Sequence, residues 1–267
     1  MQTMAQSQSI SRDSLLQYIK TNAGGTEFWV SFPPAYEEVA GAENSTRIFV
    51  ASSVRQPVTV EVPGKGWAMT KMAVANDVVE FKLPSNVGQP YSKPTTSKAP
   101  KEQVYARAGV HVVAEQPIAV YAMTRFQYTS DGFMGVPING LGQDYVIGSW
   151  PQYTASGSAF KLPAVSNIVA AYDSTEVTFV MGGTPGSKTT GGLTAGQIKK
   201  WTLNAGDVIC LANDDDGQDI AGSRVTSTKP VGVISGNQCA NVPAGVPWCD
   251  FIADMELPTV TWGKEYH

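Results

Sequence analysis

The chain has 267 residues, enough to bury either one large core or two cores of ordinary size. Its formal net charge is −4 and it contains no basic run, which argues against nucleic acid or an anionic membrane surface as a partner. No apolar stretch of about eighteen residues occurs, so the sequence predicts no membrane insertion.

Residues 1–24 are polar, and we expect them to form an N-terminal arm or linker. Leu15, Leu16 and Ile19 would support only a short amphipathic helix. The segment lacks a basic stretch followed by an apolar one, so no secretory signal peptide is recognised in this sequence.

Short strands bounded by glycine or proline dominate the chain from residue 26 onward. In the first half we predict strands at 27–32, 47–53, 57–62 and 77–83, a long proline-containing loop at 85–103 and a hairpin over 110–121 around Glu115-Gln116-Pro117. The second half repeats the order, with strands at 167–172, 176–180, 200–203 and 207–211 and a hairpin over 222–234. Helical periodicity is absent from both halves, so a parallel sheet with crossover helices is not expected.

One short phrase organises this pattern: a glycine, any residue, an acid, an aromatic residue and then an apolar one. It stands at 25–30, returns at 142–147 and begins again at 263–267. A second phrase, Gly109–Tyr121, matches Gly222–Ile234 without a gap. Because several phrases recur in the same order, we infer an internal repeat of about 115–120 residues.

These features predict an all-β protein made of two tandem antiparallel β-sandwich-like units. We expect the first unit at 25–141 and the second at 142–262. Residues 263–267 are expected to form either the opening strand of a further unit or a closing strand.

No catalytic set is recognised in the sequence. Nucleophilic catalysis needs a base beside the nucleophile, and His111 is the one histidine placed within the repeat. Its counterpart in the second unit is Arg224, which favours a structural role for both residues. The loop 182–189 resembles a phosphate-binding loop but lacks the glycine that should precede Lys188. The sequence therefore predicts a protein that is not an enzyme.

An acidic loop at 213–219 is the densest group of carboxylates. Calcium prefers oxygen ligands on flexible loops, although the spacing here does not match an EF-hand. We consider a solvated turn and a calcium site as alternatives, and expect no other cofactor. The candidate calcium ligands are Asp214, Asp215, Asp216 and Asp219.

Two loops, 122–133 and 235–250, lie in equivalent places, each between a predicted hairpin and the next opening phrase. Aromatic side chains on loops offer stiff contact area for a protein or a sugar. The alternative is that they fill the ends of the sandwiches or the joint between the units. The candidate binding residues are Phe126, Tyr128, Asp131 and Phe133 in the first loop and Trp248, Asp250 and Phe251 at the end of the second.

The three cysteines allow two interpretations. Cys239 and Cys249 would close a small loop if the compartment is oxidising, with Cys210 as a buried thiol in an apolar run. Three reduced cysteines fit the same spacing.

The opening phrase at 25–29, the segment 235–243 and the pair Cys249-Asp250 resemble the N-terminal domain of IgGFc-binding proteins. That family occurs in a mucin-like animal protein and in bacterial surface or secreted proteins. The resemblance covers about residues 24–267 and implies a secreted, non-enzymatic, adhesive role and a Cys239–Cys249 disulfide. The chain departs from the family at Phe251, where a histidine or similar residue usually follows Cys-Asp. The resemblance identifies no binding residue, and it does not imply immunoglobulin binding.

Three functional hypotheses follow. The first is an extracellular or cell-surface adhesion module that recognises a surface protein or a glycan as part of a larger multidomain or oligomeric assembly. The second is a carbohydrate-active hydrolase that uses loop carboxylates such as Asp131 or Asp250, which requires two carboxylates in one cleft. The third is an inert spacer of a surface fibre.

Overall fold

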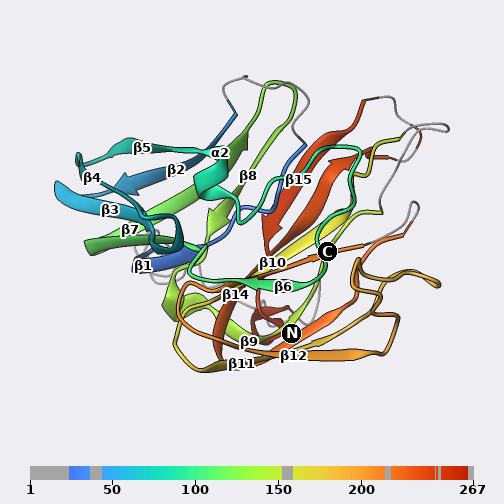
Figure 1. Cartoon of the computed structure of the whole chain (residues 1–267). Helices are drawn as coiled ribbons and strands as arrows, with labels where there is room; N and C mark the ends of the chain where they lie inside the picture. The colour runs from blue at the N-terminus through green and yellow to red at the C-terminus, as the bar shows by residue number, and fades with distance from the viewer. Residues whose placement is uncertain are drawn as a thin grey trace, which may run out of the picture.

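The computed structural model describes residues 24–36, 44–151, 159–213, 218–243, 245 and 248–263. Within these residues the regular structure is mainly strand, arranged in two antiparallel sheets as the sequence predicts (Figure 1). The first sheet contains β1 (Gly25–Val30), β2 (Ser45–Ser52), β3 (Gln56–Val62), β4 (Trp67–Ala73), β5 (Asp77–Pro84), β7 (Val110–Arg125) and β8 (Ser130–Gly135). The second contains β6 (Gln103–Tyr105), β9 (Gly142–Val146), β10 (Ala164–Ala170), β11 (Thr175–Val180), β12 (Ile198–Leu203), β13 (Val208–Ala212), β14 (Arg224–Ala240) and β15 (Asp250–Met255). Short helical turns lie between strands: η1 (Pro63–Lys65), α2 (Ser85–Gly88), η2 (Ile138–Gly140) and η3 (Thr259–Thr261).

The two sheets have the same strand order. The first runs β4-β3-β7-β2-β5, and the second runs β12-β11-β14-β10-β13 with β6 added beyond β13. β1 and β8 pair with β7 outside this path, and β9 and β15 pair with β14 in the same way. Each strand of the first sheet therefore has a counterpart in the second, which confirms the internal repeat at the level of topology.

The longest strand of each sheet, β7 or β14, is the element around which its neighbours assemble. The first half of β7 pairs with β1 and β3, and its second half pairs with β2 and β8. The predicted hairpins over 110–121 and 222–234 are therefore wrong, because the chain continues through each predicted turn as a single strand, β7 in the first case and β14 in the second. The β1–β7 register shifts at Glu115-Gln116-Pro117, since Pro117 has no N–H to donate to a ladder. Gln56 compensates: its side chain accepts the N–H of Gln116 at 2.7 Å and donates to the carbonyl of Gln116 at 3.2 Å.

The opening phrase has a structural explanation in both units. A Cβ at Gly25 would lie 2.3 Å from the Cβ of Pro137, and one at Gly142 would lie 2.3 Å from that of Pro258. Only glycine leaves room for the proline that closes the same unit. The acid of the phrase pairs with the long strand: Glu27 contacts His111 at 2.9 Å, and Asp144 makes a bidentate pair with Arg224.

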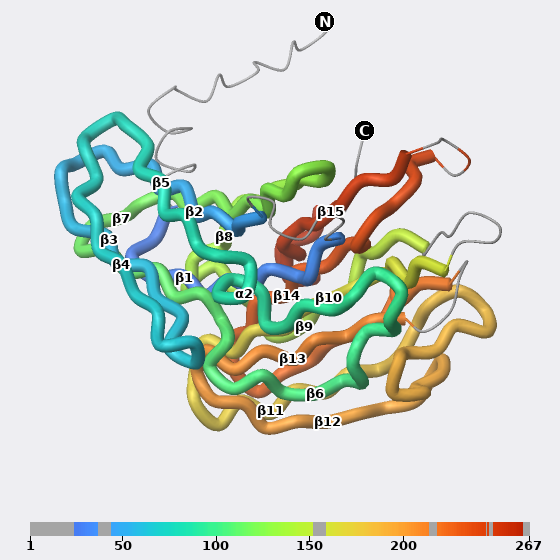
Figure 2. Tube along the Cα trace, turned by 45° about the horizontal axis from the view of Figure 1, so that its top comes forward, coloured from blue at the N-terminus to red at the C-terminus, as the bar shows by residue number. Residues whose placement is uncertain are grey.

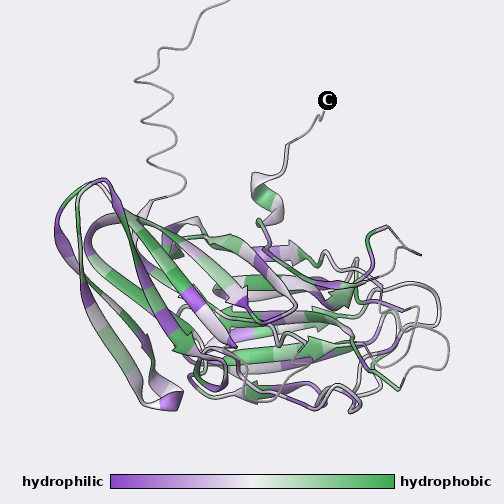
Figure 3. Cartoon of the chain, turned by 90° about the horizontal axis from the view of Figure 1, so that it is seen from above, coloured by the Kyte–Doolittle hydropathy of each residue, from purple (hydrophilic) through white to green (hydrophobic). Residues whose placement is uncertain are grey.

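The apolar residues of the strands alternate with polar ones, as Figure 3 shows by colour, and the buried set forms two main cores. One core lies within the second sheet. The other contains residues of β1, β2, β3 and β7 together with Val208, Ile234, Phe251 and Met255 from the second half of the chain. The two halves therefore share a core, because apolar side chains of β13, β14 and β15 pack against the first sheet. The unit boundaries at 25–141 and 142–262 stay a prediction.

The loop 85–103 connects the two sheets. It ends in β6, which pairs with β13 and forms an edge strand of the second sheet (Figure 2). The buried carboxylate of Glu102 accepts the N–H of Gly191 at 3.0 Å and pairs with Lys199 at 3.2 Å. Burial alone would raise the pKa of Glu102, but hydrogen bonds from Thr189, Gly191 and Lys199 and the charge of Lys199 bring it below its ordinary value. This segment of the first half is thus fixed in the second sheet. No described helix is long and apolar enough to cross a bilayer.

Candidate functional site

The two segments predicted as equivalent loops, 122–133 and 235–250, are partly strand, because β7 continues to Arg125, β8 begins at Ser130 and β14 continues to Ala240. The connections that remain lie side by side at the junction of β8 with β15. We call residues 126–131 and the described part of 239–250, namely 239–243, 245 and 248–250, the paired tips. The carboxylate of Asp250 accepts the hydroxyl of Thr129 and the N–H of Ser130, the latter at 3.1 Å. In the opposite direction, Asp131 accepts the N–H of Ala253 at 2.9 Å. The two aspartates thus exchange hydrogen bonds across the junction, each binding the backbone of the other half.

The second tip is closed by a disulfide between Cys239 and Cys249, as the family resemblance implied. Cys239 is buried beside Tyr36 and Leu162, and Cys249 packs partly against them. Cys210 is a free, buried cysteine in β13, and burial raises the pKa of its thiol well above the ordinary value. The disulfide ties the outer end of β14 to the start of β15.

The predicted aromatic residues divide into two groups. Trp248 is 93% exposed and has a positive φ of 72°, and Tyr128 is 62% exposed. Phe126, Phe133 and Phe251 are buried in the core that both halves share, so their side chains fill the joint between the units. Only Trp248 and Tyr128 therefore present a large aromatic surface to solvent at the paired tips.

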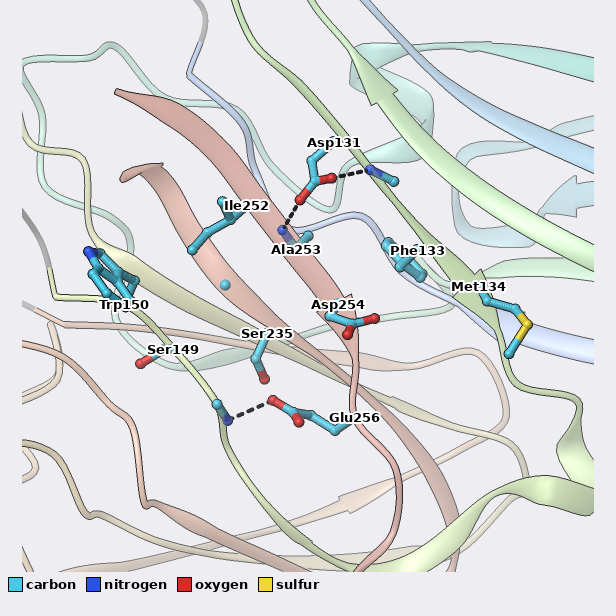
Figure 4. Close-up of a pocket in the computed structure, with 13 residues that line it drawn as sticks. Asp131, Phe133, Met134, Ser149, Trp150, Ser235, Ile252, Ala253, Asp254 and Glu256 are labelled. Atoms are coloured by element: carbon cyan, nitrogen blue, oxygen red, sulfur yellow. Dashed lines mark hydrogen bonds between the residues drawn. The ribbon is translucent and has the colours of Figure 1, made fainter. Parts of the chain in front are cut away.

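A cleft of about 630 Å³ lies beneath the paired tips, between β8 and β15 (Figure 4). We call it the inter-unit cleft. Backbone of Gly132 and Gly236 contributes to its wall, and a Cβ at Gly236 would lie 1.8 Å from the carbonyl oxygen of Ile252. Its other lining residues are Asp131, Phe133, Met134, Gly148, Ser149, Trp150, Ser235, Ile252, Ala253, Asp254 and Glu256.

The electrostatics of the cleft centre on Glu256. Burial raises the pKa of the Glu256 carboxyl above its ordinary value, and the charge of Asp254 raises it further, against hydrogen bonds from Gly148 and Ser235. The Gly148 N–H donates to Glu256 Oε1 at 2.6 Å. Figure 4 shows this bond together with the carboxylate of Asp131, which binds the amides of Gly132 and Ala253. The cleft therefore brings together three carboxyl groups, those of Asp131, Asp254 and Glu256.

The acidic loop lies mostly outside the described residues. Asp214, Asp215 and Asp216 are not described, and Asp219 is buried with its carboxylate accepting the N–H of Thr184 at 3.1 Å. Across the described ranges, no group of three or more His, Cys, Asp or Glu side chains is arranged to hold a metal. The calcium site remains an untested prediction.

His111 lies within a structural network on the first sheet. Its ring stacks on Trp29 with centroids 4.1 Å apart, and its two nitrogens lie 2.9 Å from Glu27 and 3.0 Å from Glu61. Trp29 in turn packs on Gly206, where a Cβ would fall 2.8 Å from the indole ring. The histidine therefore contributes to the contact between the two halves, and no nucleophile is among these partners.

Of the residues that line the cleft, sequence reasoning predicted only Asp131 and Phe133, and it missed the chemically distinctive Trp150, Asp254 and Glu256. Asp250, Ile252, Asp254 and Glu256 alternate along one strand and its end, which places the acids on one face. That period of two could have indicated a shared acidic surface. The sequence could not have indicated that β8 lies opposite this face, because that position depends on how the two units pack.

Comparisons with known proteins add independent findings. Residues 131–267 match the family model described as IgGFc binding protein. The chain is 26% identical over 250 residues to the protein named IgGFc-binding protein from Homo sapiens, and the aligned part covers 92% of this chain and 4% of that protein. No solved structure matches the chain significantly.

Proposed function

The chain belongs to the IgGFc-binding protein family, and from that premise we propose that it is an extracellular binding module that recognises a protein partner through the paired tips. The human relative is named for binding IgGFc. The chain spans only 4% of that relative, so the proposal extends to a protein partner and not to that ligand.

The observation that carries the proposal is the pair of exposed aromatic residues, Trp248 and Tyr128, on neighbouring tips. Tryptophan and tyrosine are enriched among the residues that dominate protein interfaces, because each buries a large area with few rotatable bonds. The tips are held before binding by the disulfide and by the Asp250 hydrogen bonds. Such preorganisation lowers the entropy cost of association.

The disulfide supports the extracellular part of the proposal. Cys239 and Cys249 are joined within a small loop, and structural disulfides persist mainly in oxidising compartments. The proposed adhesive role rests on the family membership and on the exposed tips together.

The test is a binding screen of the whole chain against an array of purified extracellular proteins, followed by alanine variants. We expect Trp248→Ala to weaken capture at least about tenfold, the loss of about 1.4 kcal/mol or more that is common for a central interface aromatic. Trp262→Ala and Tyr172→Ala are matched controls, because both side chains are exposed. Tyr172 follows the end of β10 that pairs with Val231, and Trp262 follows η3, so neither belongs to the tips. Equal losses in Trp248→Ala and Trp262→Ala would contradict the assignment to the tips. Binding to no protein of the array would favour the inert spacer.

If the protein were a hydrolase, the structure would favour other carboxylates than the two that the sequence suggested. Asp131 and Asp250 each bind backbone groups of the opposite half, and of the two only Asp131 lines the cleft. Asp254 and Glu256 meet the requirement for two carboxylates in one cleft, and Glu256 has the raised pKa that a general acid needs. We propose binding without turnover. Release of nitrophenol from a panel of nitrophenyl glycosides that Glu256→Gln abolishes would establish the hydrolase instead.

A further inference from the structure

We propose that the inter-unit cleft binds a basic side chain, arginine or lysine, of a protein partner. This inference rests on the proposed function, since it names the chemistry of one contact that such a partner makes. The cleft lies directly beneath the paired tips, because Asp131 and Asp250 at the tips are on the same strands, β8 and β15, that form its walls. A partner seated on the tips can therefore insert a side chain into the cleft.

Charge selects the class of ligand. The residues that line the cleft include the carboxylates of Asp131, Asp254 and Glu256, and the described lining contains no lysine, arginine or histidine. Burial is the main cause of the raised pKa of Glu256, and the negative charge of Asp254 adds to it, so these two carboxylates repel each other. A cation between them would relieve that repulsion, whereas an anionic ligand would add to it.

Hydrogen-bonding capacity fits the same ligand. A carboxylate has about four acceptor positions. Asp254 uses one for the N–H of Met255 at 2.8 Å, and its side chain is otherwise exposed to the cleft and solvent. Glu256 accepts from Gly148 and Ser235. The guanidinium group of arginine, with five N–H donors in a planar fork, matches a site that offers acceptors on neighbouring carboxylates.

The apolar residues of the cleft suit the aliphatic part of a basic side chain. Figure 4 shows Trp150 and Met134 on opposite sides, with Ser235, Asp254 and Glu256 between them. The indole ring of Trp150 is partly exposed, and its Nε1 donates to the carbonyl of Asn241 at 3.1 Å, which fixes the ring. A tryptophan face attracts a cation, and the methylene stem of arginine or lysine packs on apolar atoms such as those of Ile252. A volume of about 630 Å³ lies within the range of specific ligand sites.

Binding should depend on pH in a defined direction. The titratable groups that line the cleft are Asp131 on β8, Asp254 on β15 and Glu256 just after it. A cation binds the ionised carboxylates, so protonation of Glu256 competes with it. Because the pKa of Glu256 is raised, affinity should begin to fall at a higher pH than an ordinary glutamate would cause.

The experiment uses the whole chain and two small probes, Nα-acetyl-arginine amide and its neutral isostere Nα-acetyl-citrulline amide. Titration is followed by the indole resonance of Trp150 and the amide resonances of Gly132 and Gly236 in nitrogen–proton correlation spectra. We expect saturable shifts with the arginine probe at a Kd of about 1–10 mM, reasonable for a single side chain, and binding of the citrulline probe at least about tenfold weaker. Equal binding of both probes, or tighter binding of a neutral methyl glycoside at the same resonances, overturns the inference.

Matched variants separate the site from the general charge of the protein. The double variant Asp254→Asn with Glu256→Gln should lose at least about 90% of the affinity, a tenfold change. Asp77→Asn is the control, because Asp77 is also an exposed strand aspartate that accepts the N–H of the next residue, here at 2.7 Å, on the first sheet. If Asp77→Asn weakens binding as much as the double variant, the inference fails.

The probe titration needs no partner protein, so its outcome is separate from that of the array screen. If Trp248→Ala loses capture of the partner but the arginine probe does not bind, only the proposal that the cleft binds a basic side chain is refuted. If the probe binds but no protein is captured, the proposed function is refuted and the cleft is a site for cations alone.

Discussion

The reciprocal aspartates at the β8–β15 junction give a prediction whose size follows from the structure. Asp131 makes two hydrogen bonds: it accepts the N–H of Gly132 at 2.8 Å within its own strand and that of Ala253 at 2.9 Å across the junction. Asp77 makes only the first kind, to the N–H of Val78 at 2.7 Å. The difference between Asp131→Ala and Asp77→Ala therefore isolates the bond between the two halves.

A hydrogen bond to a charged acceptor contributes about 1.5–3 kcal/mol to stability. Asp131 is half-buried and borders the cleft, so in the alanine variant water can partly replace the lost hydrogen bond. We therefore use the lower end of that range. We expect Asp131→Ala to be about 1.5 kcal/mol less stable than Asp77→Ala, which corresponds to a melting temperature lower by about 3–6 °C.

The assay is urea unfolding followed by circular dichroism, with calorimetry to verify that both variants unfold in one transition. If Asp131→Ala costs no more than Asp77→Ala, the cross-junction bond does not stabilise the fold and our account of the paired tips is wrong. If Asp131→Ala divides the transition into two, the halves unfold separately and the shared core is less important than its burial implies.

Three further predictions follow from other contacts. Gly142→Ala should destabilise the protein by about 1–3 kcal/mol through overpacking against Pro258, and Pro258→Gly should recover part of that loss, as urea unfolding would reveal. The stability of Glu256→Gln relative to the wild type should increase as pH rises. The pKa of Glu256 is raised in the folded protein, so the stability that Glu256 contributes to the wild type is complete below the unfolded pKa near 4.5. That contribution is lost as pH rises through the folded pKa. Parallel unfolding curves at every pH would contradict this. Cys249→Ser should cost about 2–3 kcal/mol through loss of loop closure, and dithiothreitol should then destabilise the wild type but not the variant.

Several features of the fold could be predicted because they depend on local sequence. The Gly-x-acid-aromatic phrase located β1 and β9, and the match of 109–121 with 222–234 located β7 and β14, whose registers against β1 and β9 are equivalent. The hairpin predicted at Glu115-Gln116-Pro117 was wrong because a proline in a strand pattern is compatible with either a turn or a bulge. The side chain of Gln56, which is distant in sequence, stabilises the bulge by hydrogen bonding to Gln116.

The candidate site was predictable only in part. The sequence indicated which loops are equivalent and which residues are aromatic, but Trp248 and Phe251, three positions apart, have opposite environments: one is almost fully exposed and the other is buried. Trp248 lies in the connection before β15, whereas Phe251 lies on the face of β15 that packs against the first sheet, and neither position is visible in the residue type. Likewise the residue types of Asp131 and Asp250 do not reveal that each binds a backbone amide of the opposite half.

The sequence by itself determined that the protein is all-β, that its strand pattern occurs twice, and that two segments in equivalent places contain its distinctive residues. These are properties of short-range periodicity and of repeated phrases, which the order of residues records directly. Only the tertiary structure decided that β8 and β15 meet, that the two halves share a core, and that Asp254, Glu256 and Trp150 face one cleft with Asp131. The physical reason is that contacts between the units depend on which faces two already formed sheets bury against each other, and that choice is made by shape and burial over the whole molecule.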